Sequence, residues 1–243
     1  MSKAAERYES DLLEAAANCK KNHRFGYLDL LTSASVSSPC MLGIDEAGRG
    51  PVLDSKTLNE SQREKLLQDM LHKCDWISGV VHVISPVFIT EKMLDKSKTS
   101  LNAISHDSAI DLIQTVLDQK INLVEVYVDT VGKAEHYEAK LQGLFPQLKI
   151  RVESKADDTY PIVSAASIFA KVTRDRVLQM WPKEERGNVP EGSGIGSGYP
   201  GDPVTKSYLR MSMDPVFGFP SIVRSSWSTA FILLVQHGVP VKW

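Results

Sequence analysis

The amino-acid sequence predicts an α/β fold in which helices flank a partly parallel sheet. Short apolar runs typical of buried strands alternate with segments of helical periodicity from residue 40 to residue 181. Three of these runs end in acidic residues, and functional sites of open α/β sheets form at the carboxyl ends of strands. With 243 residues, of which 42% are hydrophobic and 24% charged, the chain is long enough to bury a core.

Composition restricts the class of protein. Summing 28 basic and 30 acidic side chains gives a net charge of -2, so any contact with nucleic acid must be local. Three cysteines without a C-x-x-C pair indicate a reducing compartment. No apolar run approaches the ~18 residues that span a bilayer, and acidic residues near the N-terminus argue against a signal peptide. These features predict a cytosolic or nuclear protein.

The first part of the chain contains one strong strand candidate. Residues 2–38 are interpreted as a polar helix and a Ser-rich linker that form an N-terminal appendage. Residues 40–44 then form a short apolar run that stops at the acidic pair Asp45 and Glu46. We therefore expect two carboxylates at the end of a buried strand.

A helix and a second strand are expected next. The pattern Thr57-x-x-Glu60 predicts a capping box that opens a helix ending near Lys73. Residues 76–84 are typical of a strand, and residues 107–120 have helical spacing of apolar side chains.

Two further strand candidates are followed by an acid. The run 123–128 ends at Asp129, and the run 148–152 leads to Asp157. Helices are expected after each, the first with Tyr137, Leu141 and Leu144 on its inner face and the second over residues 164–181.

The acids at the strand ends predict a metal site. Carboxylates drawn together repel one another, and a divalent cation relieves that repulsion. Oxygen ligands suit Mg²⁺ or Mn²⁺ better than Zn²⁺. Two such ions ~3.5–4 Å apart can activate water and stabilise the leaving oxygen of a phosphodiester. The alternative is that each acid only caps a loop or a helix.

Two glycine-containing loops and one basic helix could contact substrate. The tripeptide Gly48-Arg49-Gly50 allows close approach of backbone to a ligand, although a tight turn explains it equally. The loop 192–200 presents Tyr199, which could contact a ribose 2′-OH, or it is a flexible linker. Basic side chains on the last helix could meet phosphates or face solvent, and His106 is either an acid near the site or a packed side chain. The basic residues are Lys171, Arg174 and Arg176.

The ordered motifs resemble type 2 ribonuclease H, the ribonuclease HII family. The strings are GIDEAGRGPVL at 43–53, DSKTL at 54–58, VDTVG at 128–132, KAD at 155–157, SAAS at 164–167 and GSGYP at 196–200. The string PVFGFP at 215–220 is similar to the catalytic subunit of the eukaryotic members. The resemblance covers about residues 40 to 230 and implies a ribonuclease H-like mixed sheet with a C-terminal helical extension.

The resemblance also implies an activity and its residues. It implies hydrolysis of the RNA strand of RNA/DNA hybrids and incision at single ribonucleotides in duplex DNA, with Mg²⁺ or Mn²⁺. Two smaller non-catalytic subunits would complete a heterotrimer, located in the nucleus or in both nucleus and cytoplasm. The implied catalytic metal ligands are Asp45, Glu46, Asp129 and Asp157, and the substrate contacts are Gly48, Arg49, Gly50, Lys56, Lys171 and Tyr199.

One departure from the family pattern concerns the sheet. Leu53 is joined directly to Asp54, where the family has a further strand and a loop. We expect the strand at 76–84 to move in and pair in parallel with the strand at 41–45, with the intervening helix as a crossover. The alternative is a gapped sheet.

The expected organisation has three segments. Residues 1–38 form the appendage, residues 39–181 the catalytic domain with its internal deletion between 53 and 54, and residues 182–243 a Gly-rich loop and C-terminal extension. A non-catalytic splice variant or an incomplete gene model of the same subunit is the alternative function. A further alternative is a subunit without turnover that holds partners through the apolar run 231–235, which otherwise belongs to a final core helix.

Overall fold

The computed structural model describes residues 2–26, 37–48, 59–130, 132–190, 192, 194–199 and 201–241. The chain forms two compact units, and both are assembled from separated stretches of sequence. The first unit takes residues 1–12, 24–82 and 102–176, and the second takes residues 13–23, 83–101 and 177–243. These units cut across the three predicted segments, whose boundaries stay predictions. Within the described ranges, no helix is long and apolar enough to cross a membrane.

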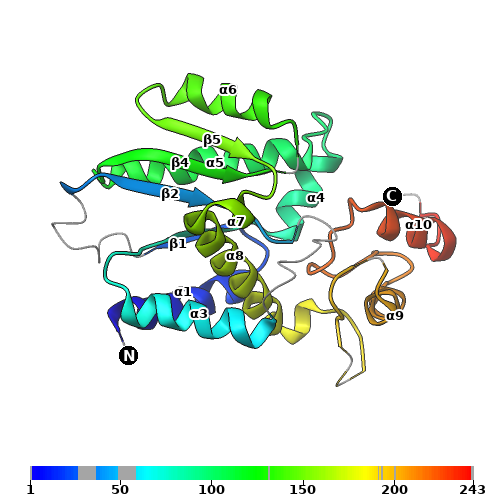
Figure 1. Cartoon of the computed structure of the whole chain (residues 1–243). Helices are drawn as coiled ribbons and strands as arrows, with labels where there is room; N and C mark the ends of the chain where they lie inside the picture. Colours follow the sequence, from blue (N-terminus) through cyan, green and yellow to red (C-terminus); the bar gives the residue numbers. More distant parts are fainter. Residues whose placement is uncertain are drawn as a thin grey trace. The chain divides into compact units, whose positions relative to one another are not determined.

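A three-stranded parallel sheet lies at the centre of the first unit (Figure 1). Its strands are β2 (Cys40–Ile44), β4 (Leu123–Asp129) and β5 (Lys149–Glu153), in the order β2-β4-β5. Ile44 pairs with Val128, which in turn pairs with Val152. The three strands predicted to end in acids are confirmed, and their parallel pairing brings their carboxyl ends to one edge.

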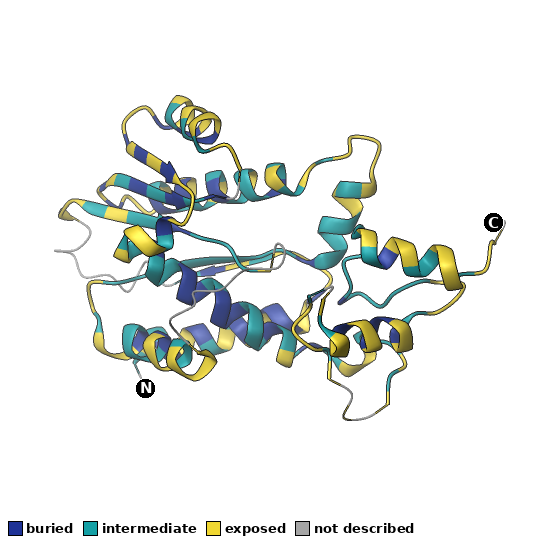
Figure 2. Ribbon diagram, turned by 45° about the vertical axis from the view of Figure 1, so that its right-hand side comes forward, coloured by how far each residue is buried: buried dark blue, intermediate teal, exposed yellow. Residues whose placement is uncertain are grey.

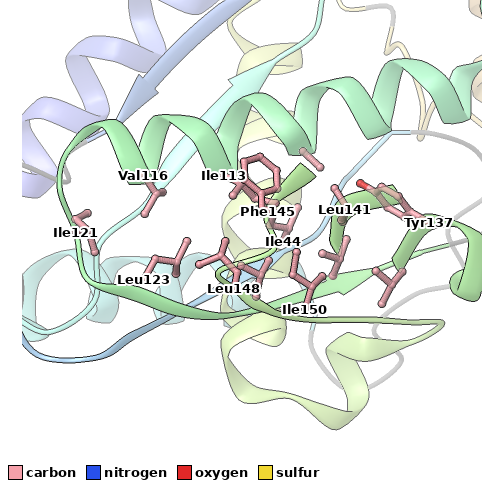
Figure 3. Close-up of a cluster of buried hydrophobic side chains, with 14 residues drawn as sticks. Ile44, Ile113, Val116, Ile121, Leu123, Tyr137, Leu141, Phe145, Leu148 and Ile150 are labelled. Atoms are coloured by element: carbon pink, nitrogen blue, oxygen red, sulfur yellow. The ribbon is translucent and has the colours of Figure 1, made fainter. Parts of the chain in front are cut away.

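Two helices build the core against this sheet (Figure 3). Ile113 from α5 (Leu101–Asp118) and Leu141 from α6 (Ala134–Leu144) are completely buried in one cluster with strand residues. Leu144, however, is 51% exposed, so its predicted inward position is wrong. The helix ends at Leu144, and the next residue, Phe145, takes the buried place.

The helix α8 (Pro161–Gln179) follows the one-turn helix α7 (Ala156–Thr159) and begins against β2. A Cβ at Gly43 would come within 2.3 Å of the Ile162 carbonyl oxygen. Only glycine allows the strand and the start of the helix to approach so closely. This contact holds α8 beside the carboxyl edge of the sheet.

Two more helices pack on α8 in the same unit. From α1 (Lys3–Ala17), the buried Tyr8 ring makes an edge contact with Phe169, and its hydroxyl lies 2.8 Å from the Thr173 hydroxyl. The second helix, α3 (Glu60–Lys73), begins with a reciprocal capping box between Asn59 and Gln62.

The predicted Thr57-x-x-Glu60 capping box is therefore wrong. Asn59 is the residue whose side chain accepts a hydrogen bond from the Gln62 N–H group, and Glu60 is already the first helical residue. Thr57 lies outside the described residues.

The strand β3 (Val80–Val83) pairs with β1 (His23–Gly26) in a separate two-stranded sheet. The predicted parallel pairing of this strand with the strand at 41–45 is therefore wrong, because the N-terminal segment supplies its partner. The pairing is antiparallel: Asn22 Oδ1 accepts from the Ser85 N–H group at 3.0 Å, and Gly26 lies beside Gly79.

Among the described strands, β2 pairs only with β4, so its outer edge has no strand partner there. The Leu53–Asp54 junction lies outside the described residues.

The second unit contains α4 (Pro86–Leu94), the 3-10 turn η2 (Lys183–Glu185), α9 (Pro203–Ser212) and α10 (Ser228–His237). In α10 only Ala230 is buried, whereas Phe231, Ile232 and Val235 are more than half exposed (Figure 2). The interpretation of the run 231–235 as a core helix is therefore wrong. Its apolar side chains remain open to contact another chain.

Candidate active site

Four acidic residues lie at the carboxyl edge of the parallel sheet. Asp45 and Glu46 directly follow β2, Asp129 is the last residue of β4, and Asp157 lies in α7, just after β5. They meet because parallel strands deliver their carboxyl ends to the same edge. All four side chains belong to the first unit.

Asp45 occupies the most desolvated position of the four. Burial raises the pKa of its carboxyl group to about 7, with the negative charge of Asp129 adding to the shift. The Ser167 hydroxyl and the Glu46 N–H group, which donates to Asp45 Oδ1 at 2.7 Å, oppose it. The charged form of Asp45 is thus short of positive partners.

Asp129 is in a similar condition. Burial raises the pKa of its carboxyl group, and the charges of Asp157 and Glu46 raise it further. The Ala156 N–H group donates to Asp129 Oδ1 at 2.8 Å and partly offsets these effects. This bond also ties α7 to the end of β4, which keeps Asp157 close to Asp129.

One face of α8 borders the acids. Ser167, Lys171 and Arg174 recur at intervals of four and three residues, which places them on one side of a helix. Lys171 Nζ lies 3.9 Å from Asp157 Oδ2, and its side chain is 10% exposed. The Arg174 side chain packs against Gly48, whose φ of +90° suits glycine.

Two predicted basic or acid groups lie elsewhere. Arg176, five residues after Lys171, projects from another face of α8 and pairs with Glu9 and Glu64, so its predicted role as a phosphate contact is wrong. The His106 ring stacks on the Tyr137 ring with centroids 3.6 Å apart. This is the packed arrangement rather than a free acid.

Tyr199 lies in a structured loop of the second unit. Asp202 organises this loop by accepting hydrogen bonds from the Ser197 N–H group and hydroxyl at 2.6 and 2.8 Å. These bonds, the backbone one first, lower the pKa of Asp202 to about 2. Gly196 and Gly198 have positive φ angles within the same turn. The loop is therefore a defined turn and not a plain linker.

Three predicted substrate contacts lie outside the described residues, namely Arg49, Gly50 and Lys56. Sequence reasoning also missed two groups that bear on the acids, the Ser167 hydroxyl and the Ala156 N–H group. Ser167 could have been found, because it lies four residues before Lys171 on the same helix face. The Ala156 N–H group carries no side-chain signal that a sequence could reveal.

The acids have the chemistry of a divalent metal site. Carboxylate oxygens are hard ligands, and the raised pKa values of Asp45 and Asp129 reflect a surplus of buried negative charge that a cation would relieve. In the described part of the chain, however, no three His, Cys, Asp or Glu side chains are spaced to hold an ion. The acids therefore interact electrostatically without forming a closed ligand set.

Comparisons with known proteins agree with this site. The profile of the family Ribonuclease HII matches residues 52–230. A ribonuclease H2 subunit from Arabidopsis thaliana is 48% identical over 240 residues, covering 88% of this chain and 80% of its own length. The ribonuclease H2 protein of the same name from Mus musculus is 46% identical over 233 residues, covering 86% and 77%.

A solved structure extends the likeness to three dimensions. The ribonuclease H2 of Pyrococcus horikoshii superimposes with a TM-score of 0.63 at 31% identity, covering 81% of this chain and 98% of its own. This similarity includes the mixed α/β architecture with helices on the sheet.

The same alignments carry a large gap in this chain. The match with the mouse protein runs over 233 positions, but 86% of 243 residues is about 209 residues. About two dozen positions of the relative therefore have no counterpart within the matched span. An internal shortening is what the direct join of Leu53 to Asp54 predicts.

Proposed function

The chain belongs to the ribonuclease HII family, and on this basis we propose that it is an endoribonuclease that hydrolyses the RNA strand of RNA/DNA hybrids. The observation that carries this proposal is the group of four acids at the carboxyl edge of the parallel sheet. Burial and mutual repulsion have raised the pKa of Asp45 and of Asp129 within it. A surplus of buried negative charge is costly for stability and useful for binding cations.

The cofactor in this proposal is a divalent metal, Mg²⁺ or Mn²⁺. Asp45 and Asp129 would be the principal ligands, and Glu46 and Asp157 would complete a site for two ions. Such cations activate a water molecule and stabilise the leaving oxygen of a phosphodiester. The chain's own part is to hold the four carboxylates on three strand ends, with Asp129 fixed by the Ala156 N–H group.

We further propose that the enzyme incises duplex DNA at single embedded ribonucleotides. Gly48, Arg49, Gly50 and Tyr199 would read the ribose 2′-OH, and Lys56 would contact a phosphate. The positive φ of Gly48 and the ordered turn before Tyr199 support such contacts, because both present backbone or an aromatic ring in a defined geometry.

The proposed assembly is a heterotrimer with two smaller non-catalytic subunits, located in the nucleus or in both nucleus and cytoplasm. The exposed apolar side chains of α10 support a role in holding a partner. Their burial against another chain would remove Phe231, Ile232 and Val235 from water.

A second candidate function is a subunit that assembles but does not turn over. The observation in its favour is the outer edge of β2, which has no partner among the described strands. Asp45 and Glu46 depend on the position of β2, and a displacement of ~1 Å can cost ~10²-fold in rate. An alternative splice product or an incomplete gene model would have this property.

The test is cleavage of labelled substrates by the purified complex with the smaller subunits. The substrates are an RNA/DNA hybrid and a DNA duplex with one ribonucleotide, each with Mg²⁺ and with EDTA. Asp157→Asn should abolish metal-dependent cleavage, whereas Asp158→Asn, which changes the adjacent exposed carboxylate, should retain it. No cleavage from a folded, assembled complex would instead favour the subunit without turnover.

A further inference from the structure

Lys171 is almost buried beside the acids of the candidate active site. Its side chain is 10% exposed, that of Asp157 is 20% exposed, and the Lys171 Nζ and Asp157 Oδ2 atoms are 3.9 Å apart. A buried ammonium group is costly unless negative charge surrounds it. The position of Lys171 is therefore explained by the surplus negative charge of the neighbouring carboxylates.

The backbone of Lys171 is held from the opposite side of α8. Two residues later, the Thr173 hydroxyl bonds to the buried Tyr8 hydroxyl of α1. Arg176 pairs with Glu9 of α1 and with Glu64 of α3. The ammonium can thus change position only through its own flexible side chain, and α8 need not move.

The distance between Lys171 and Asp157 is also informative. At 3.9 Å the pair is an ion pair by charge, but the atoms are beyond hydrogen-bond distance. Such a contact balances charge without fixing the carboxylate. The Asp157 oxygen can therefore exchange this partner for a stronger one without first breaking a hydrogen bond to Lys171.

We propose that Lys171 is the resident counter-ion of the carboxylate cluster. Without metal, its ammonium group balances Asp157; when a divalent cation enters, the ammonium withdraws and Asp157 turns to the cation. Lys171 is then a positioning residue that sets the metal affinity through competition. This role rests on the proposed function, and it explains why no three acids of the described chain are already spaced as metal ligands.

The competing role for Lys171 is direct contact with a substrate phosphate. A phosphate contact requires an ammonium group that the nucleic acid can reach, and the 10% exposure of the side chain disfavours it. The two roles predict different measurements. A counter-ion changes metal affinity without nucleic acid, whereas a phosphate contact changes the KM for the hybrid.

The experiment measures Mn²⁺ binding to the full chain in complex with its smaller subunits. Calorimetric titrations at pH 8, without nucleic acid, compare the wild type with Lys171→Met, Lys171→Gln and Lys171→Arg. The matched control is Lys149→Met, which removes the same charge from a pair with Glu125 at 2.8 Å on the strands β5 and β4. Melting temperatures are recorded in EDTA and in Mn²⁺.

Removal of a competing cation should tighten metal binding. We expect the Kd for Mn²⁺ to fall on the order of fivefold to tenfold in Lys171→Met and Lys171→Gln. Their melting temperatures should fall in EDTA and rise more on addition of Mn²⁺ than that of the wild type. Lys171→Arg should stay within about twofold of the wild type, and Lys149→Met should behave as the wild type does.

The opposite results are equally clear. An unchanged or increased Kd for Mn²⁺ in the neutral variants overturns the counter-ion role, and a raised KM for the hybrid with unchanged metal binding assigns Lys171 to phosphate. Use of two neutral variants keeps the test decisive if one of them fails to fold. If the wild type itself does not bind Mn²⁺, the proposed metal site is wrong and the counter-ion role is wrong with it.

Discussion

Two groups of buried charge lie on opposite faces of α8, and they are balanced in different ways. On one face, four acids have a single ammonium group nearby, at 3.9 Å from the nearest carboxylate oxygen. On the other face, Arg176 lies between Glu9 and Glu64, with hydrogen bonds to both. One helix thus separates an underbalanced cluster from a balanced one.

The pKa values express the same contrast. Burial and like charge raise the pKa of Asp45 to about 7, so its charged form is disfavoured. Burial alone would lower the pKa of Arg176, but its bonds to Glu64 and Glu9 outweigh burial and raise it. A balanced cluster stabilises the fold, whereas an underbalanced one is retained where a cation or substrate completes it.

The largest expected effect concerns the underbalanced cluster. Asp129→Asn keeps the size of the side chain and an oxygen for the Ala156 N–H group, but removes the charge. We expect cleavage of an RNA/DNA hybrid to fall by at least about 10²-fold, because charge stabilisation in a desolvated site is lost. Steady-state cleavage rates would measure it, with circular dichroism as the check of folding. A folded variant with more than about a tenth of wild-type activity would contradict this role.

The second effect is a gain in stability at the same cluster. The folded pKa of Asp45, about 7, lies above its ordinary value of 3.8, so stability is lost as pH rises through the folded pKa. Asp45→Asn removes this penalty. In EDTA, its stability advantage over the wild type should be larger at pH 8 than at pH 5 by about 2 kcal/mol.

Urea unfolding at both pH values measures this advantage. Asp158→Asn, at an exposed carboxylate, serves as the control and should show no such pH dependence. An advantage of Asp45→Asn that is equal at pH 5 and pH 8 would mean that Asp45 is already balanced in the folded protein.

The comparison also explains how much the sequence could reveal. The ends of β2, β4 and β5 were predictable because each short apolar run stops at an acid, which is a local pattern. The partner of β3 was not predictable in this way, because pairing is set by distant residues. The N-terminal strand β1, separated from β3 by more than fifty residues, occupies that place.

The same limit applies to the two faces of α8. The sequence shows three basic residues in six positions, and only the surrounding helices decide what each one contacts. Lys171 and Arg174 face the acids, while Arg176 points to α1 and α3. Helical spacing predicts that Arg176 differs from the other two, but it does not predict Glu9 as its partner, because Glu9 is 167 residues away.

A third prediction tests the balanced cluster. Arg176→Met leaves the carboxylates of Glu9 and Glu64 without their partner, and both are partly exposed. We expect a loss of about 2 kcal/mol in the free energy of unfolding, less than for a fully buried pair. The control is Arg24→Met, at an exposed pair with Asp111 whose loss should cost under about 1 kcal/mol. Equal losses in the two variants would remove the distinction between a balanced buried cluster and a surface pair.

The smallest effect concerns the hydroxyl pair that joins α1 to α8. The Tyr8 side chain is fully buried, and burial raises its pKa to about 12, so its hydroxyl stays protonated. Tyr8→Phe keeps the ring contacts with Phe25 and Phe169 but leaves the Thr173 hydroxyl without this bond, which should cost about 1 kcal/mol.

A double-mutant cycle with Thr173→Val isolates that bond. Because the double variant removes both polar groups, it should recover part of the loss seen in each single variant, and the coupling energy should be about 1 kcal/mol. The melting temperatures of the four proteins measure it. Strictly additive losses would mean that Tyr8 holds α8 through its ring alone. In that case α8 would be anchored opposite the acids by Arg176 and apolar packing, without help from the hydroxyl pair.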